Sequence, residues 1–247
     1  MTTTTPMTPL RKKALVAGIF YVVTFISIPT LGMYSQVKNH TGAFILGSGS
    51  QNAVLFGCLL EVIVALAGIG TAVTLYPVIK RQNESAALGF VTLRVLEAAM
   101  IFTGVLSLVS IVTLRQTAAS SPADAAALVT TGASHVATYK TTMLLGQTLM
   151  PAINGVLLGS LMYRSRLVPR IIPTMGLVGA PLLASAVVAT LLGHNSPSSP
   201  WSALATLPIA AWEFSLGVRL IVKGFSPSPI TASDAAPVAA QKELIPA

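Results

Sequence analysis

The sequence contains few charged residues. Asp, Glu, Lys and Arg make up 9% of its 247 residues, whereas soluble domains carry about 25%. Hydrophobic residues account for 53%. A soluble fold has no use for so much apolar sequence, so the composition predicts an integral membrane protein that crosses the lipid bilayer several times.

Cysteine and metal-binding motifs are scarce as well. Cys58 is the single cysteine, so no internal disulfide or thiolate metal site can form. His40, His135 and His194 all fall on one side of the predicted membrane, which permits a surface metal site, but their spacing fits no ligand motif and favours solvated loops. The sequence has no phosphate-binding loop, HExxH motif or GxSxG motif. We therefore expect no metal and no cofactor.

Six apolar segments each have at least the roughly 20 residues that a helix needs to cross about 30 Å of hydrocarbon. Backbone groups in lipid must bond internally, and the alternating strands of a membrane barrel do not occur, so these segments are predicted to be helices. The predicted fold is all-α, a bundle of six transmembrane helices within residues 11–225. The spans are expected at 14–34, 53–76, 87–113, 142–163, 172–193 and 202–223.

Polar segments flank and connect these spans. Residues 1–10 and 226–247 are predicted to be disordered tails, the second because it is rich in Pro, Ser and Ala. The connection at 116–138 contains Ser121, Pro122 and Asp124, which match the N-cap, first and third positions of a helix. A short surface helix is expected there.

The net charge of +8 indicates membrane topology, because the basic residues lie mostly at the ends of the spans. Nucleic acid is therefore not an expected partner. With six spans, both tails share one side with the connections at 77–86 and 164–171. That side carries eleven Lys and Arg residues, against three on the other, so we expect both termini in the cytoplasm. Tyr34, Tyr139 and Trp201 then fall at the outer interface, as in aromatic belts.

Four ionisable residues nevertheless lie inside the predicted spans. A charge at the centre of a membrane helix costs about 2.5–3.5 kcal/mol on insertion scales, so such residues usually face a protein interior or a water-filled cavity. Small residues share the helix faces of these side chains, which favours close contact with neighbouring helices. The predicted polar cluster is completed by two amides of the fourth span, on either side of Pro151. Its members are Glu61, Arg94, Glu97, Glu213, Asn154 and Gln147.

Charge counting shows why these residues indicate a site. Three carboxylates face one guanidinium, so at least one Glu must bind a proton or reach water or a cation. Arg94 and Glu97 can pair within one helix, while Glu61 or Glu213 could bridge to Arg94 from another helix. The alternative is that the network is structural and holds the helices in register.

Four passages carry a resemblance to a known family. They are RKKALVAGIFYVVTFIS at 11–27, LLEVIVALAGIGTAVTLYPVIKR at 59–81, LGFVTLRVLEAAM at 88–100 and WEFSLGVRLIVKGF at 212–225. Over about residues 11–225 the sequence resembles an uncharacterised bacterial family of multi-spanning membrane proteins, domain of unknown function family 4386. The resemblance implies a bacterial cytoplasmic membrane location and a shared role for the buried charges. It implies no substrate.

The sequence thus leads to one functional hypothesis and one alternative. The first is a small transporter or permease-like protein whose intramembrane carboxylates bind a proton or a small cationic or polar solute. The alternative is a non-catalytic accessory or scaffold protein. An intramembrane enzyme would need a nucleophile or metal beside the carboxylates, and the sequence offers neither. The lipid bilayer is the expected partner, and anionic lipid headgroups could bind at Arg164, Arg166 and Arg170.

Overall fold

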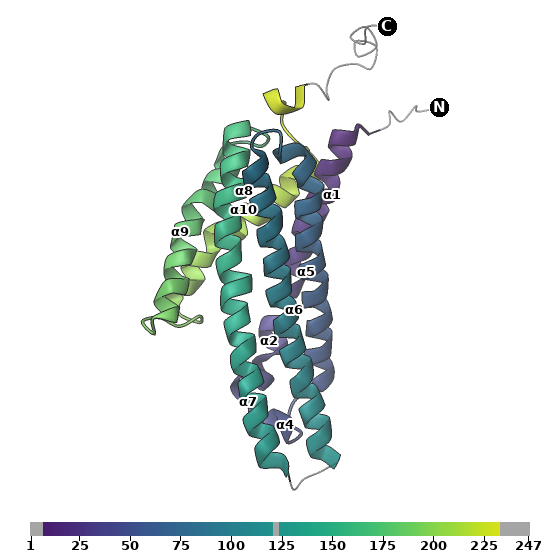
Figure 1. Cartoon of the computed structure of the whole chain (residues 1–247), viewed down its shortest axis with the longest axis vertical. Helices are drawn as coiled ribbons and strands as arrows, with labels where there is room; N and C mark the ends of the chain where they lie inside the picture. The colour runs from purple at the N-terminus through teal and green to yellow at the C-terminus, as the bar shows by residue number, and fades with distance from the viewer. Residues whose placement is uncertain (1–6, 121–123, 233–247) are drawn as a thin grey trace, which may run out of the picture.

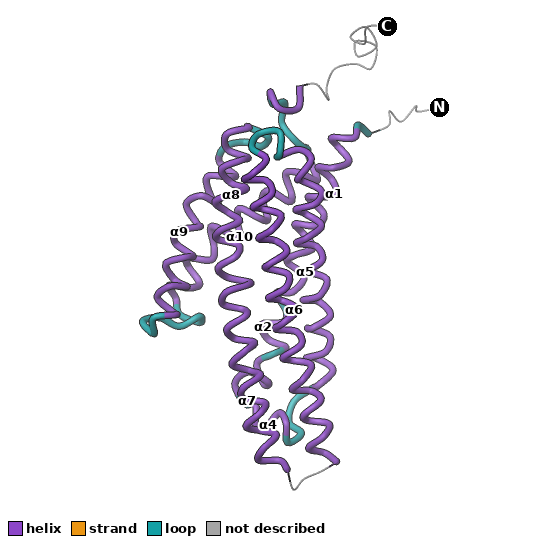
Figure 2. The backbone as a smooth tube through the Cα atoms, viewed as in Figure 1, coloured by secondary structure: helices purple, strands orange, loops and turns teal. Residues whose placement is uncertain are grey.

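A computed structural model describes residues 7–120 and 124–232, and within these ranges the chain is helical with no strand (Figures 1 and 2). Six helical segments are long and apolar enough to cross a membrane. They are Pro9–Met33, Gln51–Ile79, Glu84–Ser120, Ala125–Ser165, Ile171–Leu191 and Pro200–Val222. The predicted all-α, six-span fold is confirmed, and the protein is a multi-pass membrane protein.

The first and fourth spans consist of several helical pieces. The first contains α1 (Pro9–Val23), the 3₁₀-helix η1 (Thr24–Ser27) and α2 (Thr30–Met33), and α3 (Ser35–Asn39) and α4 (Thr41–Ile45) follow it. The fourth contains α7 (Ala125–Thr142), the π-helix η3 (Met143–Leu149) and α8 (Met150–Ser165). The other spans are α5 (Gln51–Ile79), α6 (Glu84–Ser120), α9 (Ile171–Leu191) and α10 (Pro200–Val222), and the 3₁₀-helix η4 (Pro229–Thr231) comes last.

Local sequence fixes where several of these helices begin. Thr8 and Ser199 each precede a proline, and each side-chain oxygen accepts a hydrogen bond from the backbone N–H three residues later. Ser50 caps α5 in the same way. The first N–H groups of a helix have no acceptor within the helix, and a hydroxyl N-cap accepts a hydrogen bond from one of them. Proline at the first helical position has no N–H that would need an acceptor.

The spanning segments differ widely in length. α9 and α10 contain 21 and 23 residues, or about 31–35 Å, close to one hydrocarbon thickness. α6 contains 37 residues and the fourth span 41, or about 55–60 Å. The far ends of α6 and α7 extend well past the ends of α9 and α10 (Figure 1). They therefore project beyond any bilayer that the two shorter helices span.

The segment at 116–138 differs from its prediction. Its helix, α7, continues through η3 into α8 and forms the first part of the fourth span. It is not a separate surface helix. Ser121 and Pro122, the predicted start signals, lie outside the described residues, and the side chain of Asp124 makes no cap hydrogen bond. The predicted span begins at 142 because the sequence before it is more polar. Hydropathy reports the surroundings of a segment and not the continuity of its backbone.

Both described ends of the chain lie at the same end of the bundle (Figure 1). Arg11 of α1 donates to the carbonyls of Leu220 and Ile221, at the end of α10. Residues 226–232, predicted to begin a disordered tail, are instead packed against the bundle. The Ser226 N–H donates to the Leu167 carbonyl at 2.7 Å and Thr231 is 3% exposed. The Ser228 hydroxyl donates to the carbonyl of Ser165, the last residue of α8, so this segment supplies a donor that the end of the helix lacks.

Small residues bring α1 and α10 into close contact. A Cβ atom added at Gly18 would lie 2.7 Å from the Gly217 carbonyl oxygen, so only glycine fits there. Such contacts are a common way for helices to associate in lipid. This contact places the first span beside Glu213, four residues before Gly217 on α10.

Candidate functional site

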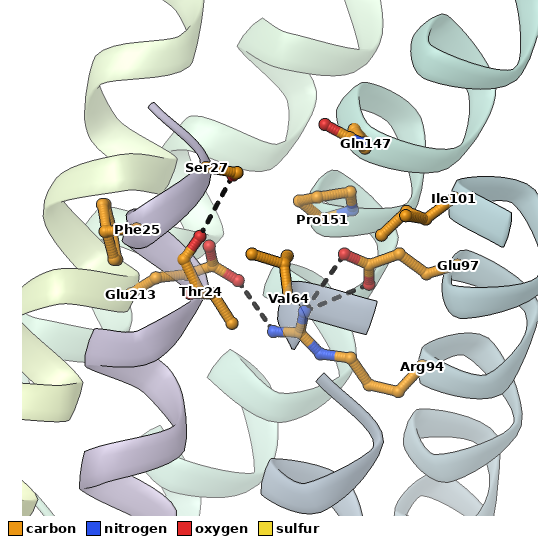
Figure 3. Close-up of a pocket in the computed structure, with 10 residues that line it drawn as sticks. All are labelled: Thr24, Phe25, Ser27, Val64, Arg94, Glu97, Ile101, Gln147, Pro151 and Glu213. Carbon is orange, nitrogen blue, oxygen red and sulfur yellow. Dashed lines mark hydrogen bonds and ion pairs between the residues drawn. The ribbon is translucent and has the colours of Figure 1, made fainter. Parts of the chain in front are cut away.

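Arg94 is the centre of a buried ionic network that joins three helices. Its side chain projects from α6 and the residue is 3% exposed. Nη1 lies 3.1 and 3.2 Å from the two carboxylate oxygens of Glu97, one turn along the same helix. Nη2 donates to Glu213 Oε1 of α10 at 2.7 Å (Figure 3). Asn154 of α8 donates from Nδ2 to Glu97 Oε2 at 3.0 Å. The network therefore links α6, α8 and α10.

Aromatic rings enclose the guanidinium. The Arg94 Cζ atom lies 5.5 Å from the ring centroid of Tyr21 and 5.7 Å from that of Phe90, within the range of cation–π attraction. Arg94 Nε and Asn154 Oδ1 are buried and have no hydrogen-bond partner among the described residues. Most buried polar atoms in proteins are paired. The hydrogen-bonding capacity of this network is therefore not fully satisfied by the described residues.

A cavity of about 160 Å³ borders this network (Figure 3). The charged side chains of Arg94, Glu97 and Glu213 form part of its wall. The other lining residues are Thr24, Phe25, Ser27, Val64, Ile101, Gln147 and Pro151. At about 30 Å³ for each water, the cavity has room for about five waters. It is smaller than the pockets of about 300–1,000 Å³ that hold drug-sized ligands.

The backbone is irregular in the helices that surround the cavity. Beside it the first span narrows to the 3₁₀-helix η1, and Pro29 follows. The π-helix η3 contains Gln147 and is followed by Pro151, which has no N–H to offer to the Gln147 carbonyl. In α10, Pro208 lies five residues before Glu213. π-Helical segments occur often at functional sites, and irregular backbone at membrane depth is tolerated where it is buried in protein or lines a cavity.

Glu61 forms a second polar group, apart from Arg94. The residue is 1% exposed, and its Oε1 accepts a hydrogen bond from the Tyr139 hydroxyl at 3.2 Å. Its Oε2 has no hydrogen-bond partner among the described residues. On α5, Gly68 faces Arg94 and Glu61 lies seven residues away, or about 10 Å farther from the termini. Gln147 lines the cavity and also lies within electrostatic reach of Glu61, so it stands between the two groups.

The predicted site residues are therefore only partly brought together. Four of them form one connected network: Arg94, Glu97, Glu213 and Asn154. Gln147 lines the cavity, and Glu61 is separate. Of the two carboxylates that could have bridged to Arg94, Glu213 does so.

The sequence did not identify the tyrosines of the site. Tyr34 and Tyr139 were predicted at the membrane interface, but they are 0% and 1% exposed and stack edge to face with ring centroids 5.6 Å apart. Tyr21 against Arg94 was not singled out at all. The sequence signal that could have indicated a buried tyrosine ring is a glycine that leaves space for it. Gly57 lies one turn before Glu61, and a Cβ there would be 2.6 Å from the Tyr34 ring.

Tyr139→Phe is expected to reduce the free energy of unfolding by about 1–2 kcal/mol, because it removes the hydroxyl that Glu61 accepts from. Tyr34→Phe provides a matched control. Tyr34 belongs to the same ring pair, but its hydroxyl is not the one that bonds to Glu61, so its loss should change stability less. Thermal unfolding of the purified protein in detergent measures both variants. Equal effects would show that the Glu61 hydrogen bond contributes nothing.

Comparison with known proteins adds a family and no activity. The model of a family described as Domain of unknown function (DUF4386) matches residues 16–224. No curated protein and no solved structure matches the sequence. The match covers all the charged residues of the network, but a function has to be argued from their geometry.

Proposed function

The chain belongs to the Domain of unknown function (DUF4386) family, and we propose that it is a small transporter or permease-like protein. Its buried carboxylates bind a proton or a small cationic or polar solute. One observation carries the proposal. Glu213 is bonded to Arg94 at 2.7 Å and at the same time lines the cavity, with 15% of its side chain exposed.

The charges of the network favour a positively charged ligand. Arg94 is within bonding distance of both Glu97 and Glu213, so with both carboxylates ionised the network carries one net negative charge. An unbalanced charge in a low-dielectric interior is costly. A proton on one carboxylate, or a small cation in the cavity, removes the imbalance. A proton that binds and leaves at this depth is what a proton-coupled transporter requires.

The position of the network also fits transport. Glu213 is the fourteenth of the 23 residues of α10, close to the middle of a helix about as long as the bilayer is thick. In many transporters the substrate and ion sites lie near the midplane, on helices whose backbone is interrupted. η1 and η3 are interruptions of this kind beside the cavity, and Pro208 lies within the helix that carries Glu213.

The proposed location of the protein rests on the distribution of its basic residues. The described termini share the end of the bundle that carries Arg164, Arg166 and Arg170, and Lys and Arg are enriched on the cytoplasmic side of membrane proteins. We therefore propose that both termini lie in the cytoplasm, with the protein in the bacterial cytoplasmic membrane that the family resemblance implies. The proton or solute site then lies partway between the cytoplasm and the outer face. Glu61 and Tyr139 are the next polar groups along the bundle toward the outer face.

Glu213→Gln tests this function. The substitution leaves Arg94 balanced by Glu97, so the melting temperature should stay within a few degrees of the unmodified protein. Proton flux into proteoliposomes, driven by a potassium diffusion potential and read with an internal pH dye, should fall at least tenfold. Uptake of methylammonium provides the corresponding measurement for a small cation.

Glu84→Gln is the matched control, because Glu84 is exposed at the start of α6 and, within the described part of the chain, accepts a hydrogen bond from Tyr76. Its flux should equal that of the unmodified protein. If the unmodified protein moves neither protons nor methylammonium faster than empty liposomes, and Glu213→Gln only lowers the melting temperature, the network is structural and the scaffold alternative holds.

A further inference from the structure

A second pocket lies at the end of the bundle that carries the termini, far along the helices from the buried carboxylates. It has a volume of about 310 Å³ and is lined by Arg166, Val168, Pro169, Arg170 and Ser226. Its residues come from two parts of the chain: the turn between α8 and α9, and the segment that follows α10. Nothing in the proposed transport function uses this pocket.

The backbone is shaped to bring these two parts together. Arg166, the C-cap of α8, has a left-handed backbone with φ of 57°, so the chain turns sharply there. The segment after α10 turns at Gly224, whose φ is +71°. It then reaches the turn through the hydrogen bond from the Ser226 N–H to the Leu167 carbonyl at 2.7 Å. The Ser226 side chain is thereby fixed on the wall of the pocket.

Positive charge is concentrated at this pocket. Among the described residues, no carboxylate forms an ion pair with Arg166 or Arg170. The Arg170 guanidinium packs over the Tyr163 ring, 4.9 Å from its centroid, and this contact restricts its position. Arg219 donates to the Ser226 hydroxyl at 3.0 Å and adds a third guanidinium behind the wall. Its buried Nε has no hydrogen-bond partner among the described residues.

We propose that this pocket binds the phosphate of an anionic phospholipid headgroup. Guanidinium groups suit phosphate because their N–H donors match its oxygens in pairs. The turn joins two membrane spans, so it lies at the edge of the bilayer, where headgroups are found. Ile171 and Val178 are 68% and 54% exposed. They lie seven residues apart, on one face of α9, and offer the acyl chains an apolar surface leading away from the pocket.

Lipid binding to the purified protein in detergent tests this assignment, with native mass spectrometry as the readout. Phosphatidylglycerol should bind to the unmodified protein more tightly than phosphatidylcholine. In the double variant Arg166→Gln/Arg170→Gln, phosphatidylglycerol affinity should fall about tenfold or more, since each basic residue near a membrane surface contributes appreciably to binding anionic lipid. Both side chains are exposed and the contact of Arg170 with the Tyr163 ring is weak at an exposed site, so the melting temperature without lipid should fall by a few degrees at most.

The matched control removes two charges from the same end of the bundle but not from the pocket. Arg164, the third arginine of the lipid site predicted from the sequence, is exposed and does not line the pocket, and neither does the exposed Lys223. Arg164→Gln/Lys223→Gln should reduce phosphatidylglycerol affinity less than threefold. Equal losses in the two double variants would overturn the proposal, because binding would then reflect diffuse surface charge. It would also be overturned if phosphatidylcholine bound equally well, or if inorganic phosphate alone displaced the lipid at matched concentrations, which would make the pocket a site for free anions.

Discussion

Arg94→Gln is expected to lower the free energy of unfolding by about 3–5 kcal/mol, enough to remove most of the folded protein from detergent extracts. The guanidinium lies 2.7–3.2 Å from oxygens of both Glu97 and Glu213. Without it, two carboxylates face each other inside the bundle with no cation. Breaking a buried ion pair by removing one partner has costs of this size, because the remaining charge is uncompensated.

Neutralising the two acids should reverse most of this loss. In the triple variant Arg94→Gln/Glu97→Gln/Glu213→Gln, no charge remains and the amides can still bond to one another, so stability should return to within about 1–2 kcal/mol. Lys12→Gln, which removes an exposed cation outside the network, should have no measurable effect. Thermal unfolding in detergent measures all three variants. A triple variant as unstable as the single one would mean that Arg94 acts through packing against Tyr21 and Phe90 and not through its charge.

The inward placement of the charges was predictable from the sequence for a simple physical reason. Lipid penalises an exposed charge so strongly that Arg94, Glu97 and Glu213 had to face the protein. The pair within α6 followed from helical spacing alone. The choice between Glu61 and Glu213 as the second partner of Arg94 did not follow, because periodicity within one helix gives no information on the axial offset between two helices. That offset places Glu61 about two turns away, beside Tyr139.

The features that the sequence did not predict depend on tertiary contacts. A hydropathy pattern shows where the apolar zone ends, and it therefore missed that α7 and α8 form one span of 41 residues. The π-helix η3 and the burial of Tyr34 were also not predicted, because each depends on which other helix packs against it. Gly57 makes room for Tyr34, and Gly146 faces the Met100 side chain. Glycines in membrane spans mark such contacts, but the sequence does not say which helix supplies the partner.

The contact between α1 and α10 is the packing feature on which the site depends most. At Gly18 the nearest atoms to an added Cβ include the Gly217 carbonyl oxygen and the Ile221 nitrogen, both backbone atoms that cannot turn aside. At Gly217 the nearest atom is Cβ of Tyr21, the residue whose ring faces Arg94. Glu213 lies one turn from Gly217. Any increase in the distance between these helices therefore moves Glu213 and Tyr21 apart, so at least one of them shifts relative to the guanidinium.

Gly18→Leu is accordingly expected to reduce the free energy of unfolding by about 3 kcal/mol, at the upper end for overpacking, because the helices must separate. Gly32→Leu is the matched control, since a Cβ at Gly32 meets no atom within 4 Å and the side chain can extend into open space. The effect of Gly18→Leu should also be smaller when Glu213 is already Gln, because residues that share a displaced contact are not additive. A double-mutant cycle from thermal unfolding measures this coupling. Full additivity would show that the α1–α10 contact stabilises the bundle without holding Glu213 against Arg94.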